Sequence, residues 1–314
     1  MGETKREKVA AVVVTYNRKH LLRECLQALL SQTEPLDEII VIDNASTDGT
    51  DEMVPAEFPQ VTYVRLPENI GGAGGFHEGM KLAYEKGHDW IWVMDDDAEP
   101  ERDTLDKLLV GAKEQRLKVI CPLIKGRDGH LQGYHHKLLK PPILKERSAI
   151  KVLETQQQSS KKVFLIDANA FLGILINREV VDSVGLPRKE FFIWGDDTEY
   201  TYRISRKYSL SVLVDAVIVH KDDRKGGSLP ITSFWKCYFG IRNKTFMVKN
   251  FEGWRGIVAL CARTLCVTVP NILLRLDHKL LRLRTVVRGI RDGLMEDFSV
   301  RSPDGARERI GLLE

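Results

Sequence analysis

Short apolar runs rich in β-branched and aromatic residues recur along the first hundred positions, and they predict β-strands. The runs are residues 9–14, 38–42, 61–66 and 90–94. Between them, residues 18–32 and 75–87 carry apolar side chains at helical spacing, and residues 46–54 favour a shorter helix. Strands that alternate with helices indicate a largely parallel sheet with helices on both faces, so we predict an α/β fold.

The pattern continues beyond residue 97 with less regularity. Residues 100–115 have the spacing of a helix, and residues 118–124 form another apolar run that predicts a strand. Residues 125–162 show little periodicity, and we interpret them as a long loop or a small subdomain. Residues 164–185 predict a strand followed by a helix, and residues 209–221 predict two further extended runs.

Composition is that of a folded globular protein, with 43% hydrophobic and 29% charged residues. The net charge of +3 conceals an asymmetry, because residues 236–314 hold 15 Lys and Arg against 8 Asp and Glu. Five cysteines without a CxxC pair argue against a zinc site or a disulfide framework, so we expect a reducing, cytoplasmic setting. We see neither a signal-peptide pattern nor 18 uninterrupted apolar residues, and we predict no membrane-spanning helix.

Polar side chains follow three of the predicted strands, at the edge where parallel sheets bind ligands. These are residues 15–17, 43–44 and 95–97, the last being three successive aspartates. Adjacent carboxylates repel and need a counter-charge, and a divalent cation is the simplest one. Asp95 and Asp97 point the same way if the strand geometry persists, which suits Mg²⁺ or Mn²⁺. An exposed acidic turn that caps the next helix would explain the triplet equally well.

Three other segments carry candidate chemistry, each with a structural alternative. The glycine-rich residues 69–80 open a helix where backbone N–H groups can approach a phosphate, although a plain loop fits as well. Residues 191–204 place Asp196, Asp197 and Glu199 among aromatic side chains, which suits acid–base catalysis or a helix N-cap. His220 ends an apolar run and is a metal ligand or a structural histidine.

Taken together and in this order, these segments resemble the inverting family 2 glycosyltransferases with the GT-A fold. The matching stretches are VVVTYNR, VIDNASTDGT, ENIGGAGGFHEGM, MDDDAEP and FFIWGDDTEYTYRI. The resemblance spans residues 8–245 and implies a Rossmann-like, nucleotide-binding mixed sheet in a GT-A domain over residues 1–245. Its nucleotide-sugar half would occupy residues 1–124 and its acceptor half residues 125–245, followed by a helical, basic segment over residues 246–314.

Carried over position by position, the resemblance implies a role for each matching side chain. The nucleotide-sugar donor would contact Thr15, Tyr16, Asn17, Asp43, Asn69, Gly74 and Asp96. Asp95 and Asp97 match the pair that holds Mn²⁺ or Mg²⁺ against the diphosphate, with His220 as an additional ligand. Asp197 matches the carboxylate that deprotonates the acceptor hydroxyl, with Asp196 as its neighbour, and Trp194 and Glu199 would contact the acceptor.

Within that family, the aspartate triplet and the acid–aromatic segment are most similar to galactofuranosyltransferases, and next to rhamnosyltransferases of cell-envelope polysaccharides. Gly195 separates Trp194 from the aspartate pair, a departure that leaves the donor open between UDP-galactofuranose, which we favour, and dTDP-rhamnose. The expected reaction is metal-dependent, inverting transfer of the sugar to a hydroxyl of a glycan or lipid-linked glycan. A non-catalytic carbohydrate-binding or scaffold protein is the alternative of another class, although retention of all the acids argues against it.

The basic C-terminal quarter suggests a surface for attachment. Residues 271–291 place six Lys and Arg among leucines at helical spacing. Such a helix can lie on the anionic cytoplasmic face of a membrane, where lipid-linked acceptors are found, or it can pack on the catalytic domain. Because no nucleic-acid-binding module is recognisable, we expect no nucleic-acid partner.

Overall fold

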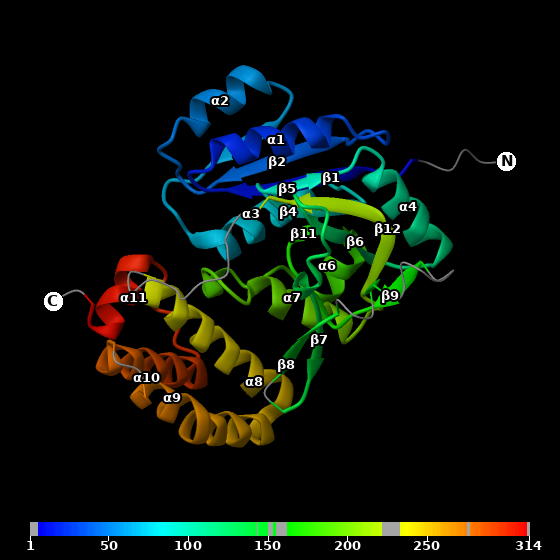
Figure 1. The fold of residues 1–314 in the computed structure, drawn as a ribbon. Coiled ribbons are helices and arrows are strands. Elements are labelled where there is room, and N and C mark those ends of the chain that lie inside the picture. The colour runs from blue at the N-terminus through cyan, green and yellow to red at the C-terminus, as the bar shows by residue number, and fades with distance from the viewer. Residues whose placement is uncertain are drawn as a thin grey trace.

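The computed structural model describes residues 6–142, 144–149, 153–154, 162–221, 233–274 and 277–312. Within these residues a nine-stranded mixed sheet has the order β3-β2-β1-β4-β11-β6-β12-β5, with β9 beside β12 (Figure 1). The strands are β1 (Val9–Thr15), β2 (Glu38–Asp43), β3 (Thr62–Arg65), β4 (Trp90–Asp95), β5 (Ala98–Pro100), β6 (Val119–Gly126), β9 (Val163–Leu165), β11 (Leu172–Asn177) and β12 (Ser211–His220).

The N-terminal half of the sheet is parallel. β1 pairs in parallel with β2 and β4, and β2 pairs in parallel with β3. β11 then runs antiparallel between β4 and β6, and β12 lies parallel to β6. The carboxyl ends of β1, β2 and β4 therefore meet at one edge, as the sequence predicts.

Helices cover both faces of the sheet. One face carries α1 (Lys19–Leu30), α2 (Thr50–Glu57) and α4 (Thr104–Glu114), and the other carries α3 (Gly71–Glu85), α6 (Arg178–Val184) and α7 (Asp196–Ser205). Strand β1 is apolar on both of its faces. Ala11 and Val13 pack against the layer that contains α1, and Val12 and Val14 pack against the layer that contains α3. The predicted α/β fold with helices on both faces is confirmed.

Several predicted elements differ from the structure in their extent or number. α3 begins at Gly71 rather than 75, because its glycines allow the helix to approach the sheet: a Cβ on Gly75 would lie 2.6 Å from Val14 Cγ1. The helix expected from residue 100 begins at Thr104, since residues 98–100 form β5 against β12. Residues 211–220 form one strand rather than two, with an irregularity between Leu213 and Val217.

The irregular residues 125–162 contribute to a small second sheet of order β10-β7-β8, built from β7 (His136–Lys140), β8 (Lys145–Ser148) and β10 (Ala168–Asn169). A 3₁₀ turn, η1 (Gly133–His135), precedes β7. Buried His136 joins the two sheets, because its Nδ1 lies 2.7 Å from Asn169 Oδ1 and its Nε2 accepts from Ile124 N at 3.3 Å. Residues 143, 150–152 and 155–161 of this stretch lie outside the described residues.

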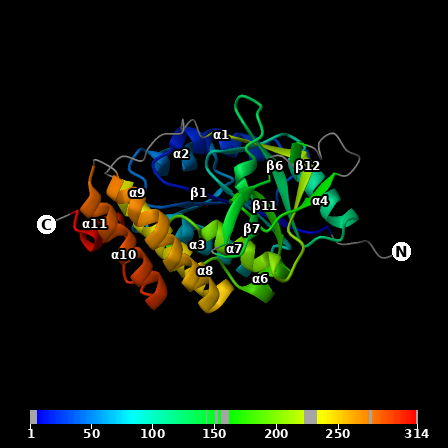
Figure 2. The same cartoon turned by 60° about the horizontal axis from the view of Figure 1, so that its bottom comes forward.

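The C-terminal helices gather on one side of the molecule, beside α3 and α7 (Figures 1 and 2). They are α8 (Phe234–Arg263), the π-helical η4 (Thr264–Thr268), α9 (Val269–Leu274), α10 (Lys279–Met295) and α11 (Pro303–Ile310). α10 packs along α8, where Tyr238 Oη donates to buried Asp292 at 2.7 Å. α8 crosses residue 245, and the domain boundary expected there stays a prediction.

The C-terminal helices differ from the single helix on which the membrane-related expectation was based. The helix expected over residues 271–291 is divided between α9 and α10. Residues 234–274 form a helical run, kinked at Gly253, that is long and apolar enough to cross a membrane by length and composition alone. Its most apolar window has a mean hydropathy of 1.9, and only 6% of that window is buried. Exposed large apolar side chains therefore lie both before the stretch that the sequence singled out, as Trp254 and Val258 do, and within it, as Leu274 and Leu280 do.

Candidate active site

A cavity of about 920 Å³ opens at the carboxyl ends of β1 and β4. Seven of the residues predicted from the sequence line it, and these are Tyr16, Asp95, Asp97, Trp194, Asp196, Asp197 and His220. The other seven do not line it: Thr15, Asn17, Asp43, Asn69, Gly74, Asp96 and Glu199. The fold thus brings together the acids of two distant segments and the strand-terminal histidine.

The aspartate triplet has a protein counter-charge in Arg18. The guanidinium lies 2.5 Å from Asp96 Oδ1 and 2.7 Å from Asp97 Oδ2. Thr15 Oγ1 donates to the other oxygen of Asp96 at 2.7 Å. Asp95 and Asp97 line the cavity, whereas Asp96 does not. Because β4 ends at Asp95 and Asp96 and Asp97 form a turn, this arrangement is set by the turn and not by the strand alternation that the sequence suggested.

His220 reaches the triplet through the pairing of β5 with β12. Ala98 is the register partner of His220, and Lys221 N donates to Asp97 O at 2.8 Å. As a result His220 Nε2 lies 3.5 Å from Asp97 Oδ1. The opposite ring nitrogen, Nδ1, lies 2.8 Å from Gln132 Oε1. Because an amide oxygen only accepts, this contact places a proton on Nδ1, and Nε2 is the ring nitrogen that faces Asp97.

Burial raises the pKa values of Asp95 and Asp96 in the aspartate triplet. It raises the pKa of Asp95 well above its usual range, assisted by the Asp97 charge and opposed by Arg18. It raises the pKa of Asp96 to about 7, with Arg18 again opposing the shift. Raised carboxylate pKa values indicate a site whose negative charge is not fully compensated by the protein, and such a site favours an added cation.

The donor set fits a hard divalent cation. Asp95 and Asp97 supply carboxylate oxygens and His220 supplies the imidazole nitrogen Nε2, which together suit Mn²⁺ or Mg²⁺. Asp97 Oδ1 and His220 Nε2 lie 3.5 Å apart at the cavity, close enough for one cation to contact both. Across the described part of the chain, however, no three His, Cys, Asp or Glu side chains are gathered closely enough to hold a metal as they stand.

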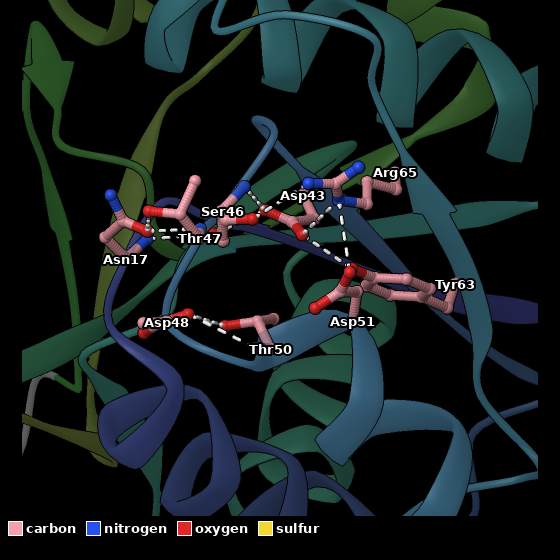
Figure 3. A network of polar contacts seen from close by, with 9 residues as sticks. All are labelled: Asn17, Asp43, Ser46, Thr47, Asp48, Thr50, Asp51, Tyr63 and Arg65. Carbon is pink, nitrogen blue, oxygen red and sulfur yellow. Dashed lines mark hydrogen bonds and ion pairs between the residues drawn. The ribbon is translucent and has the colours of Figure 1, made fainter.

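The loops that follow β1 and β2 are held by a polar network (Figure 3). Asp43 is fully buried, its Oδ1 accepts from Ser46 N at 2.9 Å, and its Oδ2 accepts from Tyr63 Oη at 2.5 Å. Burial and the Asp43 contact raise the pKa of Tyr63. Asn17 Oδ1 accepts from Thr47 N at 2.7 Å and so joins the two loops. In this structure Asp43 and Asn17 hold the loop shape instead of facing the cavity.

The glycine-rich segment is the first turn of α3. Asn69 Oδ1 accepts from Gly71 N at 2.8 Å, at the point where the helix begins. Gly71 has a φ of 79°, and a Cβ there would lie 2.1 Å from Phe192 O. This contact couples the start of α3 to the acid–aromatic segment, and Gly72 reaches the cavity wall.

Asp196 and Asp197 stand at the N-terminus of α7, after Gly195 in a left-handed conformation. Burial and the neighbouring Asp197 charge raise the pKa of Asp196 to about 7. Asp197 Oδ1 accepts from Thr198 Oγ1 at 3.0 Å, and Lys137 Nζ donates to the same hydroxyl at 2.6 Å. Lys137 of the β7–β8 hairpin thus lies close to Asp197, the predicted base.

Glu199 is buried away from the cavity. It pairs with Arg203 at 3.0 Å and with Arg188 at 3.3 Å. These contacts hold α7 to the segment before it, so the structure gives Glu199 a supporting position, and its acceptor role stays a prediction.

Sequence reasoning missed the contribution of α8. Buried Arg242 donates to Glu190 O at 2.8 Å, and Asn243 Nδ2 donates to the carbonyls of Phe191, Ile193 and Trp194 at 2.8 to 3.1 Å. These two side chains fix the loop that carries Trp194. Lys236, Gly240, Lys244 and Met247 of α8 line the cavity as well. Their spacing of three and four residues indicates that they share one helix face, although it does not show what that face contacts.

The comparisons with known proteins agree with this arrangement. Residues 10–181 match the family described as Glycosyl transferase family 2. The chain belongs to that family. It is 36% identical, over 65% of its length and 67% of the relative, to Galactofuranosyltransferase GlfT1 of Mycolicibacterium smegmatis. This family 2 protein is therefore a glycosyltransferase.

Two further likenesses bear on this glycosyltransferase. It is 24% identical to the N-acetylglucosaminyl-diphospho-decaprenol L-rhamnosyltransferase of Mycobacterium tuberculosis, over 77% of this chain and 85% of the relative. Its fold matches the crystal structure of GalNAc-T7 with UDP, GalNAc and Mn²⁺ at a TM-score of 0.60 and 15% identity, over 97% of this chain and 57% of that one. The second likeness supports the fold alone.

Proposed function

We propose that the protein is a metal-dependent, inverting glycosyltransferase that moves galactofuranose from UDP-galactofuranose to a hydroxyl of a glycan or lipid-linked glycan. One observation carries the proposal: a single cavity in a family 2 chain gathers Asp95, Asp97, His220 and Asp197. Asp95, Asp97 and His220 would hold Mn²⁺ or Mg²⁺. When bound, the metal would neutralise charge on the leaving diphosphate.

The chain's own groups account for the remaining chemistry. Asp197 takes the proton of the acceptor hydroxyl while that oxygen forms a bond to C1 of the donor sugar and the bond from C1 to the diphosphate breaks. The attack comes from the face opposite the leaving group, so the configuration at C1 inverts. Lys137 donates to the Thr198 hydroxyl, which in turn donates to Asp197, so a positive charge lies one hydroxyl away from the proposed base.

The donor side is assigned to the loops after β1, β2 and β4. Tyr16 lines the cavity, while Thr15, Asn17, Asp43 and Asp96 hold the loops around the nucleotide. Asn69 and Gly74 shape the start of α3, whose first-turn N–H groups lie next to the site proposed for the diphosphate and sugar.

Galactofuranose is favoured because the 36% identical relative is named for its transfer. The second candidate is a dTDP-rhamnose-dependent rhamnosyltransferase, which is favoured by the likeness to the rhamnosyltransferase relative. Trp194, which lies against Gly240 of α8 at the cavity, would contact the acceptor.

Attachment to the cytoplasmic face of an anionic membrane is the last part of the proposal. The exposed apolar side chains Trp254, Val258, Leu265 and Leu274 lie on the α8–α9 run, and basic side chains of α10 follow it. An apolar stripe beside cations suits an anionic lipid surface.

Product analysis tests the reaction. The full chain, with Mn²⁺ and a diol or glycan acceptor, is given UDP-galactofuranose or dTDP-rhamnose, and the product is examined by mass spectrometry and NMR. Transfer of one sugar with inverted C1 configuration, lost in Asp197→Asn and retained in Asp106→Asn, supports the proposal, because Asp106 is an exposed residue of α4 outside the cavity. Transfer of rhamnose instead supports the second candidate, and a product with retained configuration contradicts the single displacement.

A further inference from the structure

The small sheet holds the first turn of α7, which carries the proposed base, at two points. Buried Thr201 Oγ1 accepts from Asn169 N of β10 at 3.0 Å and donates to Asp197 O at 2.6 Å. Lys137 of β7 donates to the hydroxyl of buried Thr198 at 2.6 Å. The backbone of Asp197 and the side chain next to it are therefore both tied to strands of the second sheet.

The Thr198 hydroxyl can hydrogen-bond in only one direction. It has a single hydrogen, and because the Lys137 ammonium only donates, that hydrogen points to Asp197 Oδ1 at 3.0 Å. The Thr198 backbone N–H donates to the same oxygen at 2.5 Å. Within the described residues, every hydrogen bond to the Asp197 carboxylate ends on Oδ1. Since Asp197 lines the cavity, Oδ2 is the oxygen that remains for a substrate.

Lys137 is itself held in place and charged. Its side chain is only 17% exposed, and its Nζ lies 3.5 Å from Glu146 Oε2 of β8. Burial lowers the pKa of Lys137, but the charges of Asp197 and Glu146 outweigh burial and raise the pKa above its ordinary value. Lys244 of α8 fixes Glu146 in turn, because its Nζ lies 3.4 Å from Glu146 Oε1. Contacts from β8 and α8 thus keep the ammonium beside the Thr198 hydroxyl.

We propose that Lys137 and Thr198 are positioning residues that hold Asp197 Oδ1, so that Oδ2 takes the proton of the acceptor hydroxyl. The inference rests on the proposed function and deepens it by assigning the proton-accepting atom and the contacts that orient it. As the acceptor oxygen bonds to C1, its proton moves to Oδ2, and the electron pair of the breaking bond leaves on the diphosphate oxygen. Because Oδ1 keeps both hydrogen bonds, the carboxylate does not rotate during the transfer.

Steady-state kinetics test this role. The full chain, with Mn²⁺, an acceptor and whichever of the two donors the wild type transfers, is compared with Thr198→Val and Lys137→Met. Thr198→Val removes the hydroxyl at nearly constant volume and keeps the backbone N–H bond. We expect kcat to fall about tenfold or more in each variant, while the KM of the donor and the affinity for UDP stay within about twofold. Thr198→Ser should restore kcat.

A double variant separates positioning from a general structural effect. If Lys137 acts through the Thr198 hydroxyl, Lys137→Met combined with Thr198→Val should lower kcat no further than Thr198→Val alone. Lys140→Met is the matched control, because Lys140 is an exposed lysine of the same strand outside the cavity. We expect this control to keep the wild-type kcat.

The outcomes distinguish this inference from the proposed function. Wild-type kcat in Thr198→Val, or effects of the two substitutions that multiply, overturns the positioning role. A fall in kcat that follows a lower free energy of unfolding in urea, and that Thr198→Ser does not restore, overturns it as well. A wild type that transfers neither sugar is a failure of the proposed function, which appears before any variant is compared, and the positioning role then falls with it.

Discussion

Arg18 Nη1 lies 2.7 Å from Asp97 Oδ2, and this contact joins the loop after β1 to the end of β4. The guanidinium also lies 2.5 Å from Asp96 Oδ1. Although burial opposes it, the neighbouring aspartates raise the pKa of Arg18, which stays charged. Arg18 thus supplies part of the positive charge that the aspartate triplet was predicted to need. A metal bound by Asp97 would share that carboxylate with Arg18.

Replacing this cation should strengthen metal binding. In Arg18→Gln, without nucleotide, we expect Mn²⁺ to bind about fivefold more tightly, because a partly exposed ion pair of about 1 kcal/mol no longer competes for Asp97. Calorimetric titration of Mn²⁺ measures the change. Arg23→Gln is the control, since Arg23 pairs with Glu57 on the outer side of α1. Weaker Mn²⁺ binding in Arg18→Gln would show that Arg18 organises the site and does not compete for it.

The raised pKa of Asp196 should make stability depend on pH. Between its ordinary value near 3.8 and about 7, the folded protein holds a proton that the unfolded chain releases, so the free energy of unfolding falls as pH rises through this window. Asp196→Asn removes that contribution, which is at most about 4 kcal/mol. Urea unfolding at pH 4.5 and 7.5 should show a smaller decline for the variant than for wild type. A parallel decline would mean that Asp196 ionises normally.

Gly71 and Gly72 form a matched pair for testing the contact between α3 and the acid–aromatic segment. A Cβ at position 71 would lie 2.1 Å from Phe192 O at a φ of 79°, whereas a Cβ at position 72 meets nothing within 4 Å. Gly71→Ala should therefore lower the free energy of unfolding by about 2 kcal/mol or more. Gly72→Ala should leave it unchanged or raise it by up to about 1 kcal/mol, because alanine favours the helix. Equal effects in denaturant titrations would contradict the close approach.

Much of the N-terminal half could be predicted because its elements carry strong local signals. Buried parallel strands such as Val9–Thr15 read as apolar runs, and the polar side chains after them mark the ligand edge. Family 2 membership, predicted from the ordered motifs, is confirmed by the match over residues 10–181. The start of α3 was mispredicted because glycines lower helix propensity, and here their small size permits packing on Val14.

The residues that α8 and the β7–β8 hairpin contribute to the cavity were harder to predict from the sequence. Lys137 lies on a strand of the β7–β8 hairpin, whose residues lack clear alternation, and its meeting with Thr198 depends on tertiary pairing through β10. Arg242 and Asn243 sit in a long helix whose sequence gives no sign that they bind distant carbonyls. Contacts of this kind join segments far apart in the chain, and local periodicity carries no information about them.

The most direct measurement is a calorimetric titration of UDP and dTDP with and without Mn²⁺. Wild type, the Asp95→Asn/Asp97→Asn double variant and the Asp106→Asn control are compared after circular dichroism has shown that each is folded. We predict Mn²⁺-dependent binding of one nucleotide by wild type and control, and its loss in the double variant. Binding that is unaffected by Mn²⁺ or by the double substitution would contradict the metal site, and no nucleotide binding by the folded wild type would contradict the nucleotide-sugar account as a whole.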